Sequence, residues 1–221
     1  MPTLKNKSAP AQQRARVRRI IDRLEKAHPD ARLDLDFANP LELLIALILA
    51  AQARDNLVRQ ITPDLFNKYR TAEDYAKAPL AELEQQIGKI NFYRNNAKAI
   101  HNCCNELVKR FGGKVPNICK IWFPSGVGRK TTNIVLGNAF GQDTIGVDTH
   151  VMRLAQRLEL SGNTHPDKIE DDLTPIVPET RRVRFCHLLQ YHGRRICVAK
   201  KPKCRECTIR GLCPYPAKTN V

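Results

Sequence analysis

Four cysteines near the C-terminal end of this 221-residue chain have the spacing of a metal site. Cys197, Cys204, Cys207 and Cys213 follow the pattern C-x6-C-x2-C-x5-C. Thiolates so close in the chain can converge with little loss of loop entropy. A set of four suits either a tetrahedral zinc ion or a [4Fe-4S] cluster. The spacing alone therefore predicts a metal or iron–sulfur site and leaves these two alternatives open.

Three lysines lie between the first two of these cysteines, at Lys200, Lys201 and Lys203. A loop closed by a metal would hold their charges in a fixed array, and such an array suits the phosphates of a nucleic acid. We therefore expect the cysteine site to have a structural role, with the three lysines binding DNA.

A glycine-containing turn, Ser125 to Lys130, precedes a segment of helical length. Glycine lets a phosphate approach the free N–H groups at a helix start. The turn is neither a Walker motif, which needs G-x-x-x-x-G-K-[ST], nor a Rossmann fingerprint, because no strand precedes it. It predicts a helix-hairpin-helix in which Gly126, Gly128 and Arg129 bind the DNA backbone. An ordinary helix–helix turn is the alternative.

Lys130 and Asp148 are the candidate catalytic pair. Lys130 falls in the first turn of a helix, where the helix dipole and Arg129 both disfavour a second positive charge, so it is a candidate nucleophilic amine. Asp148 has the position of a helix N-cap, and capped N–H groups would keep its carboxylate ionised. The simpler alternatives are a solvated cation at Lys130 and a cap alone at Asp148.

The elements that must position these residues are all predicted to be helices. Asn39-Pro40-Leu41-Glu42 begins a helix that is apolar almost all round as far as Ala53, which predicts a central, buried helix. Strand-like alternation is nowhere sustained. Amphipathic helices are expected over residues 55–69, 80–90, 94–111, 129–140, 149–159, 166–176 and 179–192.

The charge balance favours a polyanionic partner. Lys and Arg outnumber Asp and Glu by 37 to 22, giving a net charge of +15, and most of the excess lies at the two ends of the chain. The longest apolar run, Leu43 to Ala51, is shorter than the roughly 20 residues that span a bilayer. We therefore expect a cytoplasmic, nucleoid-associated protein with no membrane partner. The remaining cysteines, in apolar helical stretches, are expected to be buried thiols: Cys103, Cys104, Cys119 and Cys186.

Taken together, these features resemble endonuclease III, the DNA glycosylase and AP lyase family with a helix-hairpin-helix. The resemblance covers residues 16–215. It rests on these segments: Pro40 to Ile45, Ala51-Gln52-Ala53, Phe92 to Asn95, Gly126 to Thr131, Val147 to His150, and His192-Gly193 followed by the four cysteines.

The resemblance implies an all-α, two-lobed fold that binds double-stranded DNA containing damaged pyrimidines or abasic sites. A basic tail, residues 1–15, would precede the two lobes. Residues 33–142 would form a six-helix barrel domain, and residues 16–32 with 143–221 a cluster domain. The family's cofactor is a [4Fe-4S] cluster, here held by Cys197, Cys204, Cys207 and Cys213. We also expect a monomer.

The resemblance further implies that Lys130 attacks C1′ of a flipped-out damaged pyrimidine, with Asp148 assisting, and that β-elimination then cuts the strand. Gln52 would fill the space that the flipped base leaves. Asn91 and Phe92 would form a loop inserted beside the lesion.

Three departures from the family pattern are visible. In the hairpin, either Pro124-Ser125 replaces a usual Leu-Pro or Ser125 is an insertion. Asn91 occupies the position of a usual glycine. Asn96 stands where a lysine is common, and Arg54 where a small polar residue is usual. Two alternative functions remain: a monofunctional mismatch-type (adenine) DNA glycosylase, which usually lacks the hairpin lysine, and a non-catalytic DNA-binding module with a structural cluster.

Overall fold

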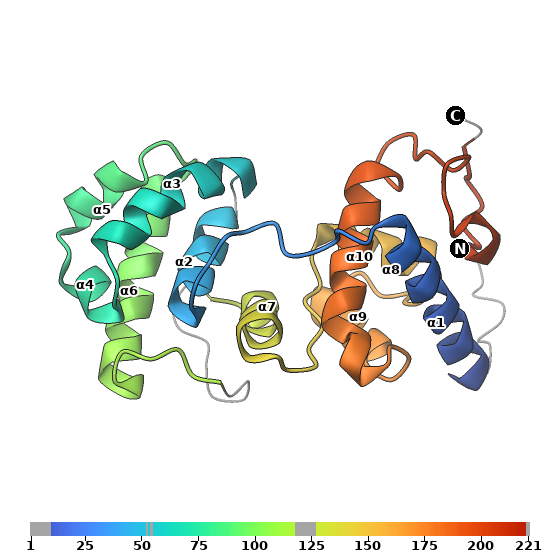
Figure 1. Ribbon diagram of the computed structural model, residues 1–221, viewed down its shortest axis with the longest axis horizontal. Helices are drawn as coiled ribbons and strands as arrows, with labels where there is room; N and C mark the ends of the chain where they lie inside the picture. The colour runs from blue at the N-terminus through green and yellow to red at the C-terminus, as the bar shows by residue number, and fades with distance from the viewer. Residues whose placement is uncertain (1–9, 52, 54, 118–126, 220–221) are drawn as a thin grey trace. The chain divides into compact units, whose positions relative to one another are not determined.

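The computed structural model describes residues 10–51, 53, 55–117 and 127–219. Every regular element in these ranges is a helix, which confirms the all-α fold class (Figure 1). The chain divides into two compact units, residues 34–142 and residues 1–33 with 143–221. None of the described helices is long and apolar enough to cross a membrane.

The unit of residues 34–142 contains six described helices. Helix α2 packs against α3, α6 and α7, while α6 also contacts α4 and α5. The six are α2 (Pro40–Ala50), α3 (Asp55–Lys68), α4 (Ala72–Lys77), α5 (Leu80–Gln86), α6 (Tyr93–Phe111) and α7 (Arg129–Phe140).

Helix α2 is the central, buried helix that the sequence predicts. The Asn39 side chain accepts a hydrogen bond from the Glu42 backbone N–H at 3.0 Å, and the Glu42 carboxylate accepts one from the Ala38 N–H at 2.6 Å. These bonds satisfy N–H groups that a helix start leaves unpaired. All side chains from Leu43 to Leu49 are buried, although α2 ends at Ala50, three residues before the predicted end.

Helix α4 is too short for its hydrophobic periodicity to be recognised, and it is absent from the sequence-based expectation. Its start is nevertheless encoded by a capping box. The Thr71 side chain accepts from the Asp74 N–H, and the Asp74 carboxylate accepts from the Thr71 N–H at 2.9 Å. Burial of Ala72 and Tyr75 then fixes the helix against α6.

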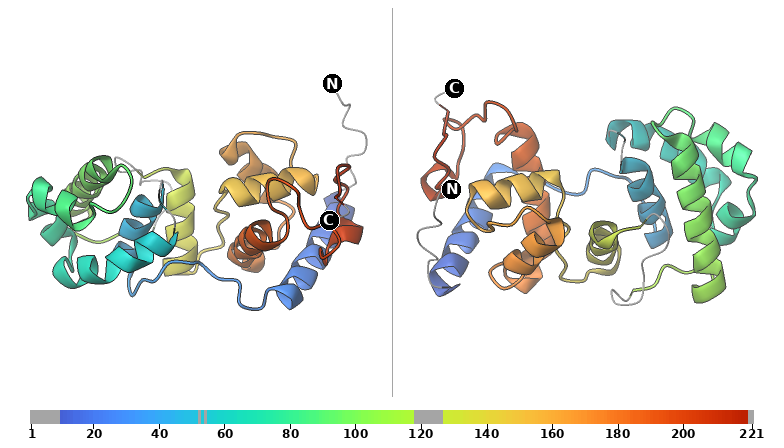
Figure 2. Two further views of the ribbon diagram at one scale, coloured as in Figure 1. Left: turned by 90° about the horizontal axis from the view of Figure 1, so that it is seen from above. Right: turned by 180° about the vertical axis from the view of Figure 1, so that it is seen from behind.

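The second unit consists of α1 (Pro10–Ala27), α8 (Thr149–Arg157), α9 (Pro166–Leu173) and α10 (Arg182–Arg195), with short 3₁₀ turns η2 (Glu179–Arg181) and η3 (Arg210–Leu212). Helix α1 begins at Pro10, so residues 10–15, expected within a basic tail, are helical. Its apolar face contributes Val17, Ile20, Ile21 and Leu24 to a core shared with α8, α9 and α10. Figure 2 shows α1 (blue) beside α10 (orange) in views that agree with their contacts.

The C-terminal segment returns to α1, although the two are almost the whole chain apart. Arg16 donates hydrogen bonds to the carbonyl oxygens of Leu212 at 3.3 Å and Leu158 at 2.8 Å. Arg23 reaches the carbonyl of Thr208 at 3.5 Å. Part of the basic charge of the N-terminal helix therefore stabilises the loop that contains the four cysteines.

Three of the four cysteines predicted to be buried thiols are confirmed as such. Cys103 and Cys104 are fully buried, and Cys186 is 5% exposed. Burial raises the pKa of Cys103 to about 12, so this thiol stays protonated and unreactive at neutral pH. Cys119 lies outside the described residues.

Candidate functional site

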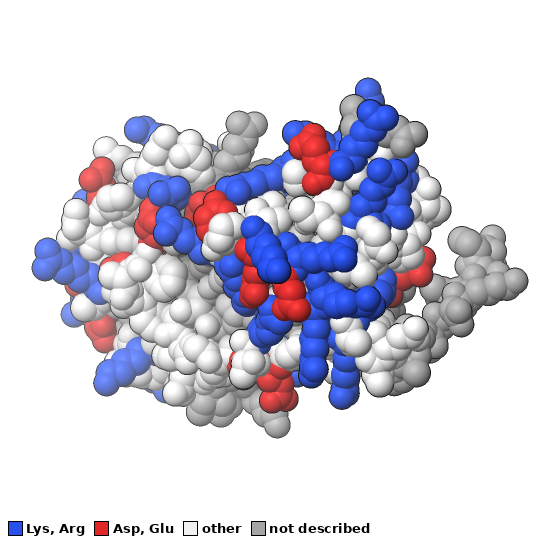
Figure 3. All heavy atoms as spheres, turned by 45° about the vertical axis from the view of Figure 1, so that its right-hand side comes forward, with Lys and Arg blue, Asp and Glu red and all other residues white. Residues whose placement is uncertain are grey.

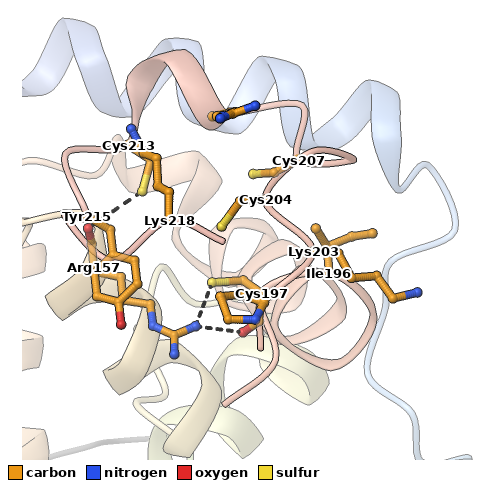
Figure 4. Close-up of a pocket in the computed structure, with 11 residues that line it drawn as sticks. Arg157, Ile196, Cys197, Lys203, Cys204, Cys207, Cys213, Tyr215 and Lys218 are labelled. Carbon is orange, nitrogen blue, oxygen red and sulfur yellow. Dashed lines mark hydrogen bonds between the residues drawn. The ribbon is translucent and has the colours of Figure 1, made fainter. Parts of the chain in front are cut away.

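The four clustered cysteines line one pocket in the loop that follows α10. The pocket is partly open to solvent, and its lining also includes Arg157 and Tyr215. Figure 4 shows the four sulfur atoms pointing toward the same space. Residues that span 17 positions of the chain are therefore brought to one pocket by the loop.

The chemistry of the pocket is that of a thiolate metal site. Among the described residues, no three His, Cys, Asp or Glu side chains come together closely enough to hold a single metal ion as they stand. A [4Fe-4S] cluster binds each of four thiolates through a different iron, so its ligands surround a volume rather than a point. The four cysteines that line this pocket supply the donor set that such a cluster takes.

Helix α8 is bonded to the first of the cysteines by two arginines. Arg157 donates to Cys197 Sγ at 3.1 Å and to the Val198 carbonyl at 2.9 Å, and its guanidinium lies 4.8 Å from the centre of the Tyr215 ring. Arg153 donates to the carbonyls of Cys197 at 3.2 Å and Gly193 at 2.8 Å. The position of the cysteine loop is thus coupled to α8.

Asp148 caps the opposite end of the same helix. Its Oδ1 accepts hydrogen bonds from the backbone N–H groups of His150 at 2.9 Å and Val151 at 2.7 Å, as expected for an N-cap. Among the described residues, none donates a hydrogen bond to Oδ2. The cap therefore fixes the orientation of the carboxylate.

Lys130 lies in the first turn of α7 with its side chain exposed to solvent. The preceding Gly128 has φ −93°, which any residue adopts, and a Cβ built there would meet no atom within 4 Å. The fold itself does not require glycine at this position, and the space in front of it is open. Gly126 lies outside the described residues, and Arg129 begins the helix.

The loop before α6 presents an aromatic side chain to solvent. Phe92 is 61% exposed and has φ 59°, a left-handed conformation that is strained for a bulky residue. This conformation falls on Phe92 and not on Asn91, where the family's usual glycine suggested it. Asn96 is 8% exposed and donates to the Asn91 carbonyl at 3.4 Å, so it supports the loop from within. Asn91 is exposed, and Gln52 lies outside the described residues.

The cysteine loop presents its lysines outward. Lys200, Lys201 and Lys203 are all exposed, and Lys201 has φ 51°. The Lys203 ammonium is 4.0 Å from the Glu206 carboxylate. Figure 3 shows a dense group of lysine and arginine side chains on one face of the molecule.

A buried histidine pair contacts Cys207 of the cysteine pocket, and sequence patterns did not reveal it. His28 Nε2 is 3.1 Å from His192 Nδ1, and His192 Nε2 is 3.4 Å from Cys207 Sγ. The two rings are 5% and 1% exposed. Burial lowers the pKa of His192 to about 4, so this ring is neutral at pH 7.

Comparison with known proteins identifies the family. Residues 45–179 match the HhH-GPD superfamily of base excision DNA repair proteins. Endonuclease III of Synechocystis is 42% identical over 216 residues, which cover 97% of this chain and 98% of the relative. The chain belongs to the endonuclease III family. As the sequence predicts, this makes it a bifunctional DNA glycosylase and AP lyase of base excision repair.

Solved endonuclease III structures have the same fold. A non-covalent endonuclease III–DNA complex superimposes with a TM-score of 0.86 at 40% identity, covering 91% of this chain and 95% of that one. A trapped covalent endonuclease III–DNA intermediate gives the same TM-score and identity, with 91% and 96% covered. The two-lobed helix-hairpin-helix glycosylase fold is therefore confirmed.

Proposed function

We propose that this protein excises oxidised pyrimidines from double-stranded DNA and cleaves the resulting abasic strand by β-elimination, with Lys130 as nucleophile and Asp148 as its assistant. The observation that best supports these roles is the fixed Asp148 carboxylate. Oδ1 is held by two backbone N–H groups, and Oδ2 has no described donor. A carboxylate so oriented can accept a proton or face a developing cation without reorganising.

The chemistry assigned to Lys130 begins with its unprotonated amine. Nζ attacks C1′ of the damaged nucleotide, the C1′–N bond to the base breaks, and the base leaves with the electron pair and takes up a proton. The C1′–O4′ bond of the sugar then breaks, the ring oxygen takes up the second amine proton, and a C=N bond forms between Lys130 and C1′, which is a Schiff base. Removal of a C2′ proton then expels the 3′ phosphate. Asp148 would accept the ammonium proton and stabilise positive charge at C1′.

The DNA contacts that we propose come from three sets of residues. Gly126, Gly128 and Arg129 would bind the phosphate backbone at the start of α7. Exposed Phe92, with Asn91 beside it, would insert next to the lesion, and Gln52 would fill the space of the flipped base. The lysines of the cysteine loop, Lys200, Lys201 and Lys203, would neutralise further phosphates.

We propose that Cys197, Cys204, Cys207 and Cys213 hold a [4Fe-4S] cluster. The bound cluster would supply rigid closure of the lysine-bearing loop, in line with the hydrogen bonds from Arg157 and Arg153 that already position it. Iron and sulfide analysis with a broad visible absorption band tests this assignment, and stoichiometric zinc without that band would contradict it.

We further propose that the protein acts as a monomer in the cytoplasm, associated with the nucleoid. Residues 33–142 would be the barrel domain, residues 16–32 with 143–221 the cluster domain, and residues 1–15 a basic extension. Size-exclusion chromatography with light scattering tests the monomer, and a dimeric mass would contradict it.

The experiment that tests the function is a glycosylase assay on duplexes containing thymine glycol, a dihydropyrimidine, hydroxycytosine or an abasic site. We expect base release with strand cleavage for the wild type, and retained DNA binding with much slower base release for Asp148→Asn. Asp143→Asn, at an exposed position nearby, is the control and should act like the wild type. Base release without strand cleavage would instead support a monofunctional glycosylase, and binding without release a non-catalytic module.

A further inference from the structure

Two buried histidines form a hydrogen-bonded row that ends at a cysteine sulfur. Starting from the end of α1, His28 Nε2 is 3.1 Å from His192 Nδ1, on α10, and His192 Nε2 is 3.4 Å from Cys207 Sγ. The ring centroids lie 5.4 Å apart at an interplanar angle of 58°. Residues 164 positions apart in the chain thus meet behind Cys207, which lines the cysteine pocket.

The direction of the two hydrogen bonds follows from the chemistry of the thiolate. A cysteine that ligates iron is deprotonated and can only accept a hydrogen bond, so the proton between it and His192 resides on Nε2. A neutral imidazole has one N–H, so His192 Nδ1 is then an acceptor. The proton between the rings therefore belongs to His28 Nε2, and the row donates toward the sulfur.

His28 is held in place by groups outside the pocket. Arg184 donates to the carbonyl oxygens of His28 and Pro29, each at 3.3 Å, and also to that of Ala31. Arg195 forms an ion pair with Asp30 at 3.1 Å. The segment that follows α1 is thereby fixed against α10, and the His28 ring is held by its hydrogen bond to His192.

We propose that His28 and His192 are positioning residues for the cluster: the row they form fixes the Cys207 ligand and raises the cluster's reduction potential. This inference rests on the [4Fe-4S] cluster of the proposed function. A donor N–H stabilises the more negative, reduced state of a cluster in preference to the oxidised state. Because the hydrogen-bond partner of the His28 ring is His192 and that of His192 is Cys207, the effect of His28 is exerted through the polarisation and orientation of His192.

The experiment measures the reduction potential of the purified, cluster-loaded full-length protein on an electrode, without DNA. Variants are His28→Phe, which removes the donor, and His28→Gln, whose amide N–H replaces it. We expect His28→Phe to shift the potential downward by up to about 59 mV, equivalent to a tenfold change in a one-electron equilibrium. His28→Gln should restore most of that shift, and His192→Phe should shift the potential at least as far as His28→Phe.

His187→Gln is the matched control. It alters another half-buried histidine of α10, which lies five residues before His192 and therefore about 140° away around the helix. The reduction potential of His187→Gln should equal that of the wild type. Iron content is measured on every sample, so the potential refers only to loaded molecules.

The outcomes separate this inference from the cluster itself. Wild-type protein without iron would overturn both. If His28→Phe carries a full cluster and its reduction potential is unchanged, the proposed role of the two histidines is contradicted, while the cluster assignment remains intact. An equal downward shift in His28→Phe and His28→Gln would also overturn it, because a purely structural role predicts no rescue by a donor.

Discussion

Arg157 donates a hydrogen bond to the sulfur of Cys197 at 3.1 Å, at the opposite end of α8 from Asp148. One short helix therefore connects the cysteine pocket to the candidate catalytic carboxylate. Loss of this connection should disturb the loop, and through α8 the position of Asp148.

Replacing Arg157 should release the cysteine loop. Arg157→Met removes charged hydrogen bonds to Cys197, Val198 and Ala199 and should destabilise the protein by about 2–3 kcal/mol, with lower iron retention. Arg157→Lys keeps the positive charge but loses the planar guanidinium group, so its stability and iron retention should lie between those of the wild type and Arg157→Met. Thermal unfolding and iron content are the measurements. If Arg157→Met unfolds at the same temperature as the wild type and retains its iron, Arg157 does not hold the cysteine loop.

A methyl group at Gly193 should displace the neighbours of Asp148. A Cβ there would lie 3.0 Å from Arg153 Nη2 and 3.2 Å from His150 Cβ, so Gly193→Ala should cost about 1–2 kcal/mol of stability and slow base release. Gly211→Ala, whose Cβ would meet nothing within 4 Å, is the control. Denaturant unfolding with single-turnover kinetics measures both effects. Equal behaviour of the two alanine variants would show that α8 tolerates the displacement.

Gly128→Ala should separate DNA binding from folding. With φ −93° and no atom within 4 Å of the new Cβ, its stability should match the wild type to about 0.5 kcal/mol. If a phosphate approaches this backbone, the methyl group should weaken DNA affinity at least tenfold, about 1.4 kcal/mol. Fluorescence anisotropy with an abasic-site duplex measures the affinity, and an unchanged value would exclude a close phosphate.

Two substitutions of Phe92 should differ in stability, although both should lower activity. Its φ of 59° is strained for phenylalanine and alanine but not for glycine, so Phe92→Gly should be about 1 kcal/mol more stable than Phe92→Ala. Both variants lose the exposed ring and should release the damaged base more slowly. Unfolding curves and glycosylase rates test the two statements independently. Full activity in either variant would remove the ring from the proposed wedge.

Acid should destabilise the protein partly through His187. Burial lowers the pKa of His187 to about 4 from an unfolded value of 6.5, so the unfolded state binds more protons between these values. Stability contributed by this group is present above pH 6.5 and is lost as the pH falls toward 4, by about 1–2 kcal/mol at pH 5. His187→Gln should show a shallower loss between pH 7 and 5 in urea unfolding. If His187→Gln and the wild type lose stability equally between pH 7 and 5, burial of His187 does not contribute to acid destabilisation.

The sequence predicts local features of this fold better than distant ones. Helix α2 was predictable because Asn39, Pro40 and Glu42 encode its start and its apolar run encodes its burial. The cap at Asp148 was predictable for the same reason. Helix α4 was missed because the signal of Thr71 and Asp74 lies beside too short an apolar pattern.

Contacts between distant segments have no local signature. The bond between Arg157 and Cys197 spans 40 positions and the pair His28–His192 spans 164. Both arise from packing of α1, α8 and α10, which periodicity cannot specify. The strained φ at Phe92 is likewise a property of the folded loop, because local preference would place it at Asn91.

The central claim is that Lys130 is the nucleophile, and borohydride trapping tests it most directly. Borohydride reduces the Schiff base to a stable amine, so the wild type should be covalently attached to a duplex containing an abasic site or an oxidised pyrimidine. Lys130→Ala should give no adduct, while Lys200→Ala, which alters an exposed lysine of the cysteine loop, should still be trapped at saturating DNA. Full trapping of Lys130→Ala would contradict the assignment.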